Sequence, residues 1–247
     1  MKIVIYSSIM VKNPTTDKPI DLPSSFELIP GYDYVLITNL VNGKEIFKKS
    51  GWNKGEIRIM EPPEEEMPNK NRRAWQVYAN RWFKWHPDKL FSDYDIVIYV
   101  DGFNIPNFNK KEEWNKIIGK FCNETQLLIL QDNHPKNSCI YQEHDSIVKC
   151  GKDNYFSMIR VTKYVKTMGC PLDIGLYWNG CYIYKTGSKI IQKVWSDMWF
   201  DMLSYTYRDQ ALLMFEIWRN NAFQNWGKAP LNTLVLAVDS DSNHGGY

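Results

Sequence analysis

The segment from Tyr94 to Gly102 constrains the fold more than any other part of this chain. Its centre, Ile96-Val97-Ile98-Tyr99-Val100, is apolar without interruption, and an acid and a glycine follow at once. A short run of this kind predicts a strand buried on both faces of a largely parallel sheet. Such sheets bind ligands at the carboxyl ends of their strands. Asp101 is therefore placed where a carboxylate can hold a divalent cation against a phosphorylated substrate. The alternative is that Asp101-Gly102 is only the turn that ends the strand.

The rest of the chain alternates between predicted strands and helices. Strands are expected at 3–6, 34–37, 57–60, 126–131, 178–184 and 234–238, and helices at 71–85, 111–121, 155–168, 188–203 and 208–220. This order, with short connections in the first half, predicts an α/β fold of the doubly wound kind. We expect one domain with a central, mostly parallel sheet flanked by helices.

Composition excludes several classes of protein. A chain of 247 residues with 44% hydrophobic residues can bury the core of one large domain. A formal net charge of +2 argues against a nucleic-acid-binding surface. Five widely spaced cysteines without a CxxC pair indicate free thiols in a reducing compartment. Because the first residues do not resemble a signal peptide and no run approaches the ~20 apolar residues of a membrane span, we expect a cytoplasmic protein, in the host cytoplasm if viral.

Common catalytic motifs are missing. No GxGxxG follows the first expected strand, and neither GxxxxGK[ST] nor GxSxG occurs. The usual dinucleotide fold, the phosphate-binding loop and the Ser-His-Asp hydrolases therefore have no motif support. A metal-dependent hydrolase would need a tighter group of ligands than four dispersed histidines supply.

Several segments, taken in order, resemble one protein family. They are 31–39, 84–91, 94–102, 134–143 and 169–176, followed by Trp195, Trp199 and Tyr207-Arg208-Asp209-Gln210. Together they resemble a glycosyltransferase-like family with a GT-A type fold, which includes plant mucilage and pollen-turgor proteins and related domains in bacteria and large viruses. The resemblance covers most of residues 31–220. It implies a single domain with a nucleotide-sugar-binding half at 1–101, and an acceptor-binding half and C-terminal tail at 102–247.

The resemblance also implies a metal ion, held by an acid pair at the end of the central strand. Here the usual acid-x-acid is Asp101-Gly102-Phe103, so the second acid is missing. The expected cofactor is Mn²⁺ or Mg²⁺, with Asp101 as one ligand and His244 as the candidate second ligand. The alternative for His244 is an exposed histidine in a tail.

Basic residues offer a second way to stabilise the leaving diphosphate, on which negative charge gathers during glycosyl transfer. Three of them precede the central strand: Arg73, Arg81 and Lys84. They would assist where a cation is weakly held. The alternative for each is a position on a solvated helix face.

An inverting transfer needs a base that deprotonates the acceptor hydroxyl, and Asp209 is the candidate. It lies at the start of the helix expected at 208–220, where a helix N-terminus favours an ionised carboxylate. The spacing Thr206-x-x-Asp209 is also that of a capping box, in which Asp209 would only satisfy the helix end. The resemblance around Asp209 favours the catalytic role.

The remaining candidates would contact donor or acceptor. Residues at the ends of the first two expected strands are candidates for the nucleotide: Tyr6, Ser7, Ser8, Thr38 and Asn39. Gly102 is placed beside them by the central strand. Candidates for the sugars are His134, Glu143, Asn179, Gly180 and Arg208. The alternatives are a loop held by polar contacts for His134 and Glu143, and a hairpin turn for Asn179-Gly180.

Two functions follow from these residues. The first is transfer of a sugar from a nucleotide-sugar donor to a glycan or glycoprotein acceptor, with metal assistance. The second is a non-catalytic sugar- or nucleotide-binding module on the same fold, which the missing second acid favours. Turnover of a donor in the presence of Mn²⁺ separates the two.

Overall fold

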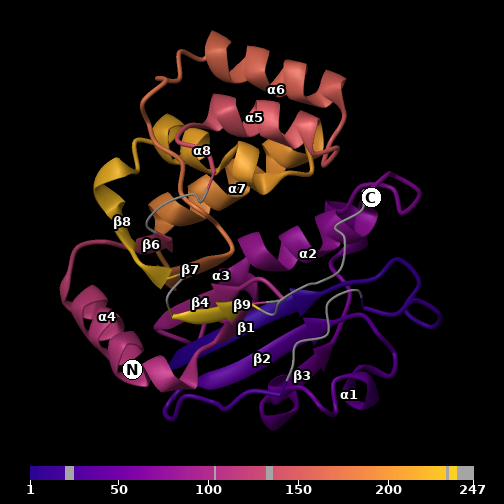
Figure 1. The fold of residues 1–247 in the computed structure, drawn as a ribbon, viewed down its shortest axis with the longest axis vertical. Helices are drawn as coiled ribbons and strands as arrows, with labels where there is room; N and C mark the ends of the chain where they lie inside the picture. Colours follow the sequence, from indigo (N-terminus) through magenta and orange to yellow (C-terminus); the bar gives the residue numbers. More distant parts are fainter. Residues whose placement is uncertain (20–24, 103, 132–135, 232–233, 238–247) are drawn as a thin grey trace.

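One mixed sheet organises the protein, which the computed structural model describes at residues 1–19, 25–102, 104–131, 136–231 and 234–237. The sheet has seven strands in the order β3-β2-β1-β4-β7-β6-β8 (Figure 1). They are β1 (Ile3–Ile9), β2 (Asp33–Thr38), β3 (Glu56–Ile59), β4 (Ile96–Val100), β6 (Leu128–Gln131), β7 (Cys181–Lys185) and β8 (Trp226–Ala229). Only β7 runs antiparallel to its neighbours β4 and β6; the other pairs are parallel. The predicted fold class, a mostly parallel sheet flanked by helices, is confirmed.

Helices cover both faces of this sheet. They are α1 (Gly43–Ile46), α2 (Trp75–Trp85), α3 (Pro87–Leu90), α4 (Lys111–Asn123), α5 (Ile140–Lys149), α6 (Tyr155–Thr167), α7 (Lys189–Ser204) and α8 (Leu213–Arg219). The face covered by α2, α7 and α8 carries one core cluster, and the face covered by α4 carries the other. A separate two-stranded sheet pairs β5 (Asn104–Pro106) with β9 (Val235–Ala237).

Strand β4 lies at the centre of the sheet, between β1 and β7. Its side chains alternate between the two core clusters: Val97 and Tyr99 join one, and Ile96, Ile98 and Val100 join the other. All five are buried, as the uninterrupted apolar run predicts. The strand ends immediately before Asp101, so this acid does lie at the carboxyl end of the central strand.

Two expected helices differ from the structure. Helix α2 begins at Trp75 and not at 71, because Ala74 adopts a left-handed backbone conformation with φ of 60° that ends the preceding turns. The helix expected at 208–220 is broken into a 3-10 turn, η4 (Asp209–Ala211), and α8. The break falls at Leu212, whose backbone is not helical.

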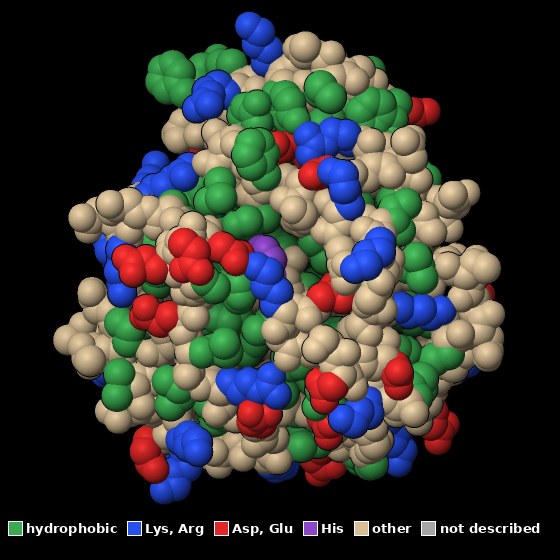
Figure 2. All heavy atoms as spheres, turned by 180° about the vertical axis from the view of Figure 1, so that it is seen from behind, with side chains coloured by type: hydrophobic (Ala, Val, Ile, Leu, Met, Phe, Trp, Pro, Cys, Tyr) green, Lys and Arg blue, Asp and Glu red, His purple; other side chains and the backbone are tan. Residues whose placement is uncertain are grey.

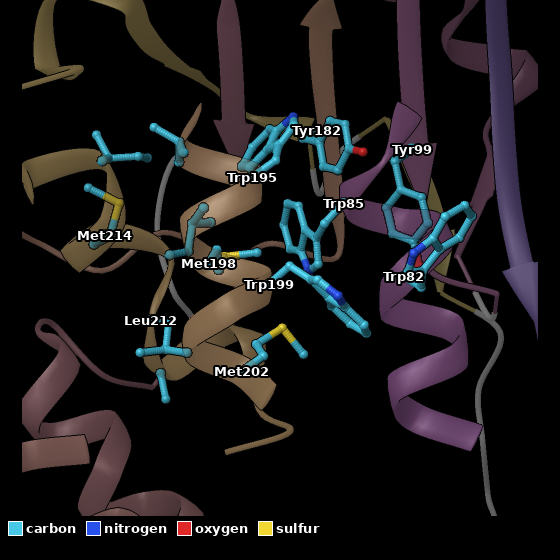
Figure 3. Packing of buried hydrophobic residues seen from close by; sticks show 14 of the residues in the cluster. Trp82, Trp85, Tyr99, Tyr182, Trp195, Met198, Trp199, Met202, Leu212 and Met214 are labelled. Carbon is cyan, nitrogen blue, oxygen red and sulfur yellow. The ribbon is translucent and has the colours of Figure 1, made fainter. Parts of the chain in front are cut away.

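Aromatic side chains form the core between α2, α7 and the sheet (Figure 3). Trp85 stacks on Tyr182 with ring centroids 5.6 Å apart and contacts Trp195 at 4.7 Å. The hydroxyl of Tyr6 lies 3.0 Å from the carbonyl oxygens of both Phe83 and Lys84. These contacts fix the end of α2 on the sheet, which positions the side chains of its last two turns.

The surface charges, the helices and the cysteines can be compared with the expectations from composition. On the face shown in Figure 2, acidic and basic side chains are interspersed over the lower half, without one continuous basic area. Within the described ranges, no helix has the length and apolar character that a bilayer span requires. All five cysteines have free thiols.

Charged side chains of α7 and α8 meet at the contact between these helices. Their arrangement predicts that the free energy of unfolding depends on pH. Glu216 lies 2.6 Å from Arg219, which also pairs with Asp201 at 3.2 Å. Burial and hydrogen bonding to Asp201 raise the pKa of Glu216 to about 9, against the opposing charge of Arg219. Between the ordinary value of 4.5 and about 9, the folded state keeps a proton that the unfolded state releases, so the free energy of unfolding falls as pH rises.

Glu216→Gln is therefore expected to weaken this decline, since glutamine resembles the protonated acid and cannot ionise. Urea unfolding of both proteins at about pH 6 and about pH 9 measures it. An equal decline in the variant would show that Glu216 is ionised in the folded protein.

Candidate active site

Asp101 anchors a polar site at the carboxyl end of β4. Its backbone N–H donates to Gly180 O (2.8 Å), and its Oδ1 accepts a hydrogen bond from the Tyr99 hydroxyl (2.9 Å). Its side chain is 13% exposed, so it lies at the rim of the core and reaches solvent. The β4–β7 pairing sets this arrangement, because Val100 faces Cys181 and so brings Gly180 beside Asp101.

Helix α2 directs two cations toward this acid. Arg81 and Lys84, three residues apart, share one face of the helix. Arg81 Nη1 lies 3.3 Å and Lys84 Nζ 3.6 Å from Asp101 Oδ1. The Lys84 side chain has no exposed surface, so the predicted alternative of a solvated helix face is wrong for Lys84.

Asp209 completes the group from the other half of the chain. Its Oδ2 lies 2.9 Å from Arg81 Nε and 3.0 Å from Lys84 Nζ. We call Arg81, Lys84, Asp101 and Asp209 the ion-pair cluster. In it, two cations each contact two carboxylates, and the four formal charges sum to zero.

The capping-box alternative for Asp209 is wrong. The Thr206 hydroxyl donates to Asp153 Oδ2 (2.6 Å) and accepts from the Arg208 N–H (3.1 Å). Asp209 starts a 3-10 turn and its Oδ1 accepts from the Gln210 N–H (3.1 Å). At the end of this turn, His144 Nε2 lies 3.0 Å from Ala211 O. Because a carbonyl oxygen can only accept, the imidazole N–H is the donor. The turn that carries Asp209 is thus held from α5.

Charge pairing controls ionisation within the cluster. Burial opposes ionisation of Asp209, but the charges of Arg81 and Lys84 outweigh it and hold its pKa below the ordinary value. Burial lowers the pKa of Lys84, while the two carboxylates oppose that shift. A base works best when its pKa is near the operating pH. In this arrangement, Asp209 is therefore better suited to hold the two cations than to take a proton.

Asn179 and Gly180 lie beside the ion-pair cluster, at the start of β7. The Asn179 N–H donates to Gln210 Oε1 (3.1 Å), which ties this segment to the turn that carries Asp209. Asn179 Nδ2 is buried and has no partner among the described residues, so it can serve a ligand. The hairpin alternative is wrong, because β6 and β7 are separated by α5 and α6 and Gly180 has no positive φ.

Gly180→Ala is expected to destabilise the protein by about 1–3 kcal/mol. A Cβ there would lie 2.1 Å from the Trp178 ring, so the ring or the start of β7 must shift. Gly119→Ala, in α4, is the matched control, since a Cβ there meets nothing within 4 Å. It is expected to gain about 0.5–1 kcal/mol. Chemical unfolding measures both; equal effects would mean that the Trp178 contact does not constrain Gly180.

The residues expected at the ends of the first two strands lie deeper than predicted. Strand β1 continues to Ile9, so Tyr6, Ser7 and Ser8 lie within it and not at its end. All three are buried, and the Ser8 hydroxyl donates to Asn80 O (3.1 Å). Tyr6 belongs to the core described above. These positions fit packing better than contact with a nucleotide.

The end of β2 supports the loop that follows β1. The Asn39 side chain accepts from Val11 N–H (2.9 Å) and donates to Val11 O (2.8 Å). The Thr38 hydroxyl accepts from the Leu40 N–H (3.2 Å). Both polar side chains are buried and hold the backbone of neighbouring segments.

The other predicted site residues are dispersed. Arg208 is half-buried beside Asp209, over the ring of Tyr207 at 5.9 Å, while Arg73 is exposed. Gly102 packs against β1, where a Cβ would lie 3.0 Å from Ile9. Glu143 is buried on α5 and accepts from Asn137 Nδ2 (2.5 Å). His134 and His244, and the tail expected to cover the donor, lie outside the described residues.

In the part of the chain that the structure describes, the donor set does not fit a divalent cation. Mn²⁺ and Mg²⁺ take several oxygen ligands. Within the described ranges, no three His, Cys, Asp or Glu side chains are grouped closely enough to hold a metal ion. Asp101 Oδ1 and Asp209 Oδ2 are each paired with Arg81 and Lys84, and Gly102 supplies no side-chain oxygen.

Three contributors to the site were missed by sequence reasoning. Tyr99 precedes Asp101 by two residues, so the alternation of a strand predicts the same face for both. Gln210 and His144 fix the segments around Asp209, and only contacts between distant parts of the chain identify them.

Known structures resemble this chain at low identity, whereas no family model and no curated protein matches it. The bifunctional glycosyltransferase WbbM shares 12% identity over 93% of this chain, with a TM-score of 0.47. This chain spans only 38% of the WbbM chain. Glucosyl-3-phosphoglycerate synthase from Mycobacterium tuberculosis shares 10% identity over 92% of this chain and 68% of its own, with a TM-score of 0.44.

A glycosyltransferase involved in glycosylating the major capsid of PBCV-1 is similar to the same degree. It shares 13% identity over 94% of this chain and 83% of its own, with a TM-score of 0.43. Likeness at this level does not identify an activity for this chain, which has to be argued from the site.

Proposed function

We propose that this protein is a glycosyltransferase that moves a sugar from a nucleotide-sugar donor to a glycan or glycoprotein acceptor. One observation carries the proposal: Asp101, Arg81, Lys84 and Asp209 meet at the carboxyl end of the central strand. Ligands of open α/β sheets bind in this region. The resemblance of the segments around Asp101 and Asp209 to a glycosyltransferase-like family supports the same reaction class.

The proposed roles follow from exposure and charge. Arg81 and Arg208 face the donor phosphates, where they stabilise the negative charge that develops on the leaving group. Asp101 and Asn179 bind sugar hydroxyls. Asp101 accepts hydrogen bonds from them, and the unpartnered Nδ2 of Asn179 donates to them. Lys84 and Asp209 hold these groups in place from the buried side.

A hollow elsewhere on the described part of the molecule fits this function less well. A hollow of about 480 Å³ lies between α5 and α6, with Tyr155, Ile159 and Lys163 among its lining residues. No member of the ion-pair cluster lines it. We place the donor at the cluster because the buried charges and the unpartnered amide are found there.

A non-catalytic sugar- or nucleotide-binding module remains the second candidate. Asp209, the expected base, is buried and paired with two cations, which favours binding over proton transfer. A module would still bind a nucleotide sugar at Arg81 and Asn179.

Release of free nucleotide from a panel of nucleotide sugars, with and without acceptor glycans, tests the proposal. A transferase releases nucleotide from at least one donor, faster when an acceptor is present. Binding of a donor without release in any combination would favour the module. Neither binding nor release would contradict both candidates.

A further inference from the structure

The ion-pair cluster already contains the positive charge that a metal ion would bring. Arg81 uses Nε for Asp209 and Nη1 for Asp101, while Lys84 Nζ lies between the same two carboxylates. Each carboxylate therefore contacts both cations, and the cluster carries no net charge. A divalent ion approaching Asp101 would meet Arg81 and Lys84 at close range, with no net negative charge to attract it.

The guanidinium of Arg81 still has a donor to offer. Its Nη2 has no partner among the described residues, and its side chain is 17% exposed. Arg208, half-buried next to Asp209, adds a further positive charge, and in the described ranges no carboxylate lies within ion-pair distance of it. A planar guanidinium matches the oxygens of a phosphate in geometry as well as in charge.

We infer that Arg81 and Lys84 take the place of the divalent cation in this site, so that a nucleoside diphosphate group binds at Arg81 without a metal ion. The inference rests on the proposed function and specifies how the donor is held. Lys84, which has no exposed surface, is a positioning residue. It holds both carboxylates from the buried side, while the Arg81 side chain remains partly exposed to a ligand.

The inference can be tested by thermal unfolding. The melting temperature of the EDTA-treated protein is measured with UDP, GDP, CDP, ADP or dTDP, each with and without added Mn²⁺. A bound ligand raises the melting temperature according to its concentration and affinity. We expect at least one diphosphate to give the same shift in EDTA as in Mn²⁺. We also expect no binding of Mn²⁺ alone, measured by the loss of its free EPR signal.

A shift that appears only with Mn²⁺, or tight binding of Mn²⁺ alone, would overturn the inference while leaving the proposed transferase intact. Absence of any shift under both conditions would contradict the proposed function itself, and the inference with it. Both readouts use the unaltered protein and so do not depend on the folding of a variant.

Arg81→Met is expected to weaken diphosphate binding by about tenfold or more, because it removes the forked donor. Arg160→Met, on α6, is the matched control, since Arg160 donates to the Ser204 carbonyl and lies over the ring of Tyr205, and it pairs with no carboxylate of the described residues. Equal diphosphate affinity in the two variants would remove Arg81 from the site.

Discussion

Asp209→Ala is expected to destabilise the protein by about 3–5 kcal/mol, the largest effect that the ion-pair cluster predicts for folding. The substitution leaves Lys84, which has no exposed surface, and the guanidinium of Arg81 with only the more distant Asp101 as a partner. A buried charge that loses its partner costs more than the pair contributed, because its desolvation is no longer offset. Urea unfolding followed by tryptophan fluorescence measures the loss.

Asp197→Ala is the matched control for this experiment. Asp197 also contacts a lysine and an arginine, at 2.7 Å and 3.6 Å, but its side chain is 24% exposed. Solvent screens such a pair, so a change of only about 0–1 kcal/mol is expected. If Asp209→Ala were no more damaging than Asp197→Ala, the cluster would not be a buried, mutually dependent unit.

Asp101→Asn is expected to reduce donor turnover by about 10²–10³-fold while the fold is retained. Asparagine keeps the shape of the side chain but lacks the negative charge that orients Arg81 and accepts hydroxyls of the sugar. The Tyr99 hydroxyl can still donate to the amide oxygen, so the local packing is preserved. Nucleotide release at saturating donor, together with the melting temperature, separates loss of turnover from loss of structure.

Asp95→Asn supplies the comparison for Asp101, because Asp95 lies at the other end of the same strand and is exposed. It should leave turnover unchanged. Near-native turnover in Asp101→Asn would exclude Asp101 from the reaction and leave the binding-module alternative in place.

The parts of the fold that local pattern determines were predictable. The uninterrupted apolar run at 96–100 predicts a strand that is buried on both faces. The buried face of α2 could be recognised from the helical spacing of Trp75, Tyr78, Trp82 and Phe83. The errors fall where pattern is weak or tertiary contacts decide. Helix α5 carries several polar residues and was not predicted, and neither were the short strands β5 and β8.

The site was only partly predictable, for a different reason. Asp101 could be placed from its position after the strand, whereas the local sequence around Arg81, Lys84 and Asp209 favoured a solvated helix face or a helix cap. What distinguishes them is mutual contact: Asp209 is far from Lys84 in sequence and 3.0 Å away in space. Charge neutralisation of this kind has no local signature, so the burial of Lys84 could not be predicted.

The binding of phosphate at Arg81 can be seen in a crystal structure with a nucleoside diphosphate, chosen as the one that most raises the melting temperature. We expect phosphate oxygens within hydrogen-bond distance of the Arg81 guanidinium, beside the partly exposed Asp101 side chain. Phosphates bound elsewhere, for example between α5 and α6 with the Arg81 guanidinium unchanged and out of reach, would contradict this expectation.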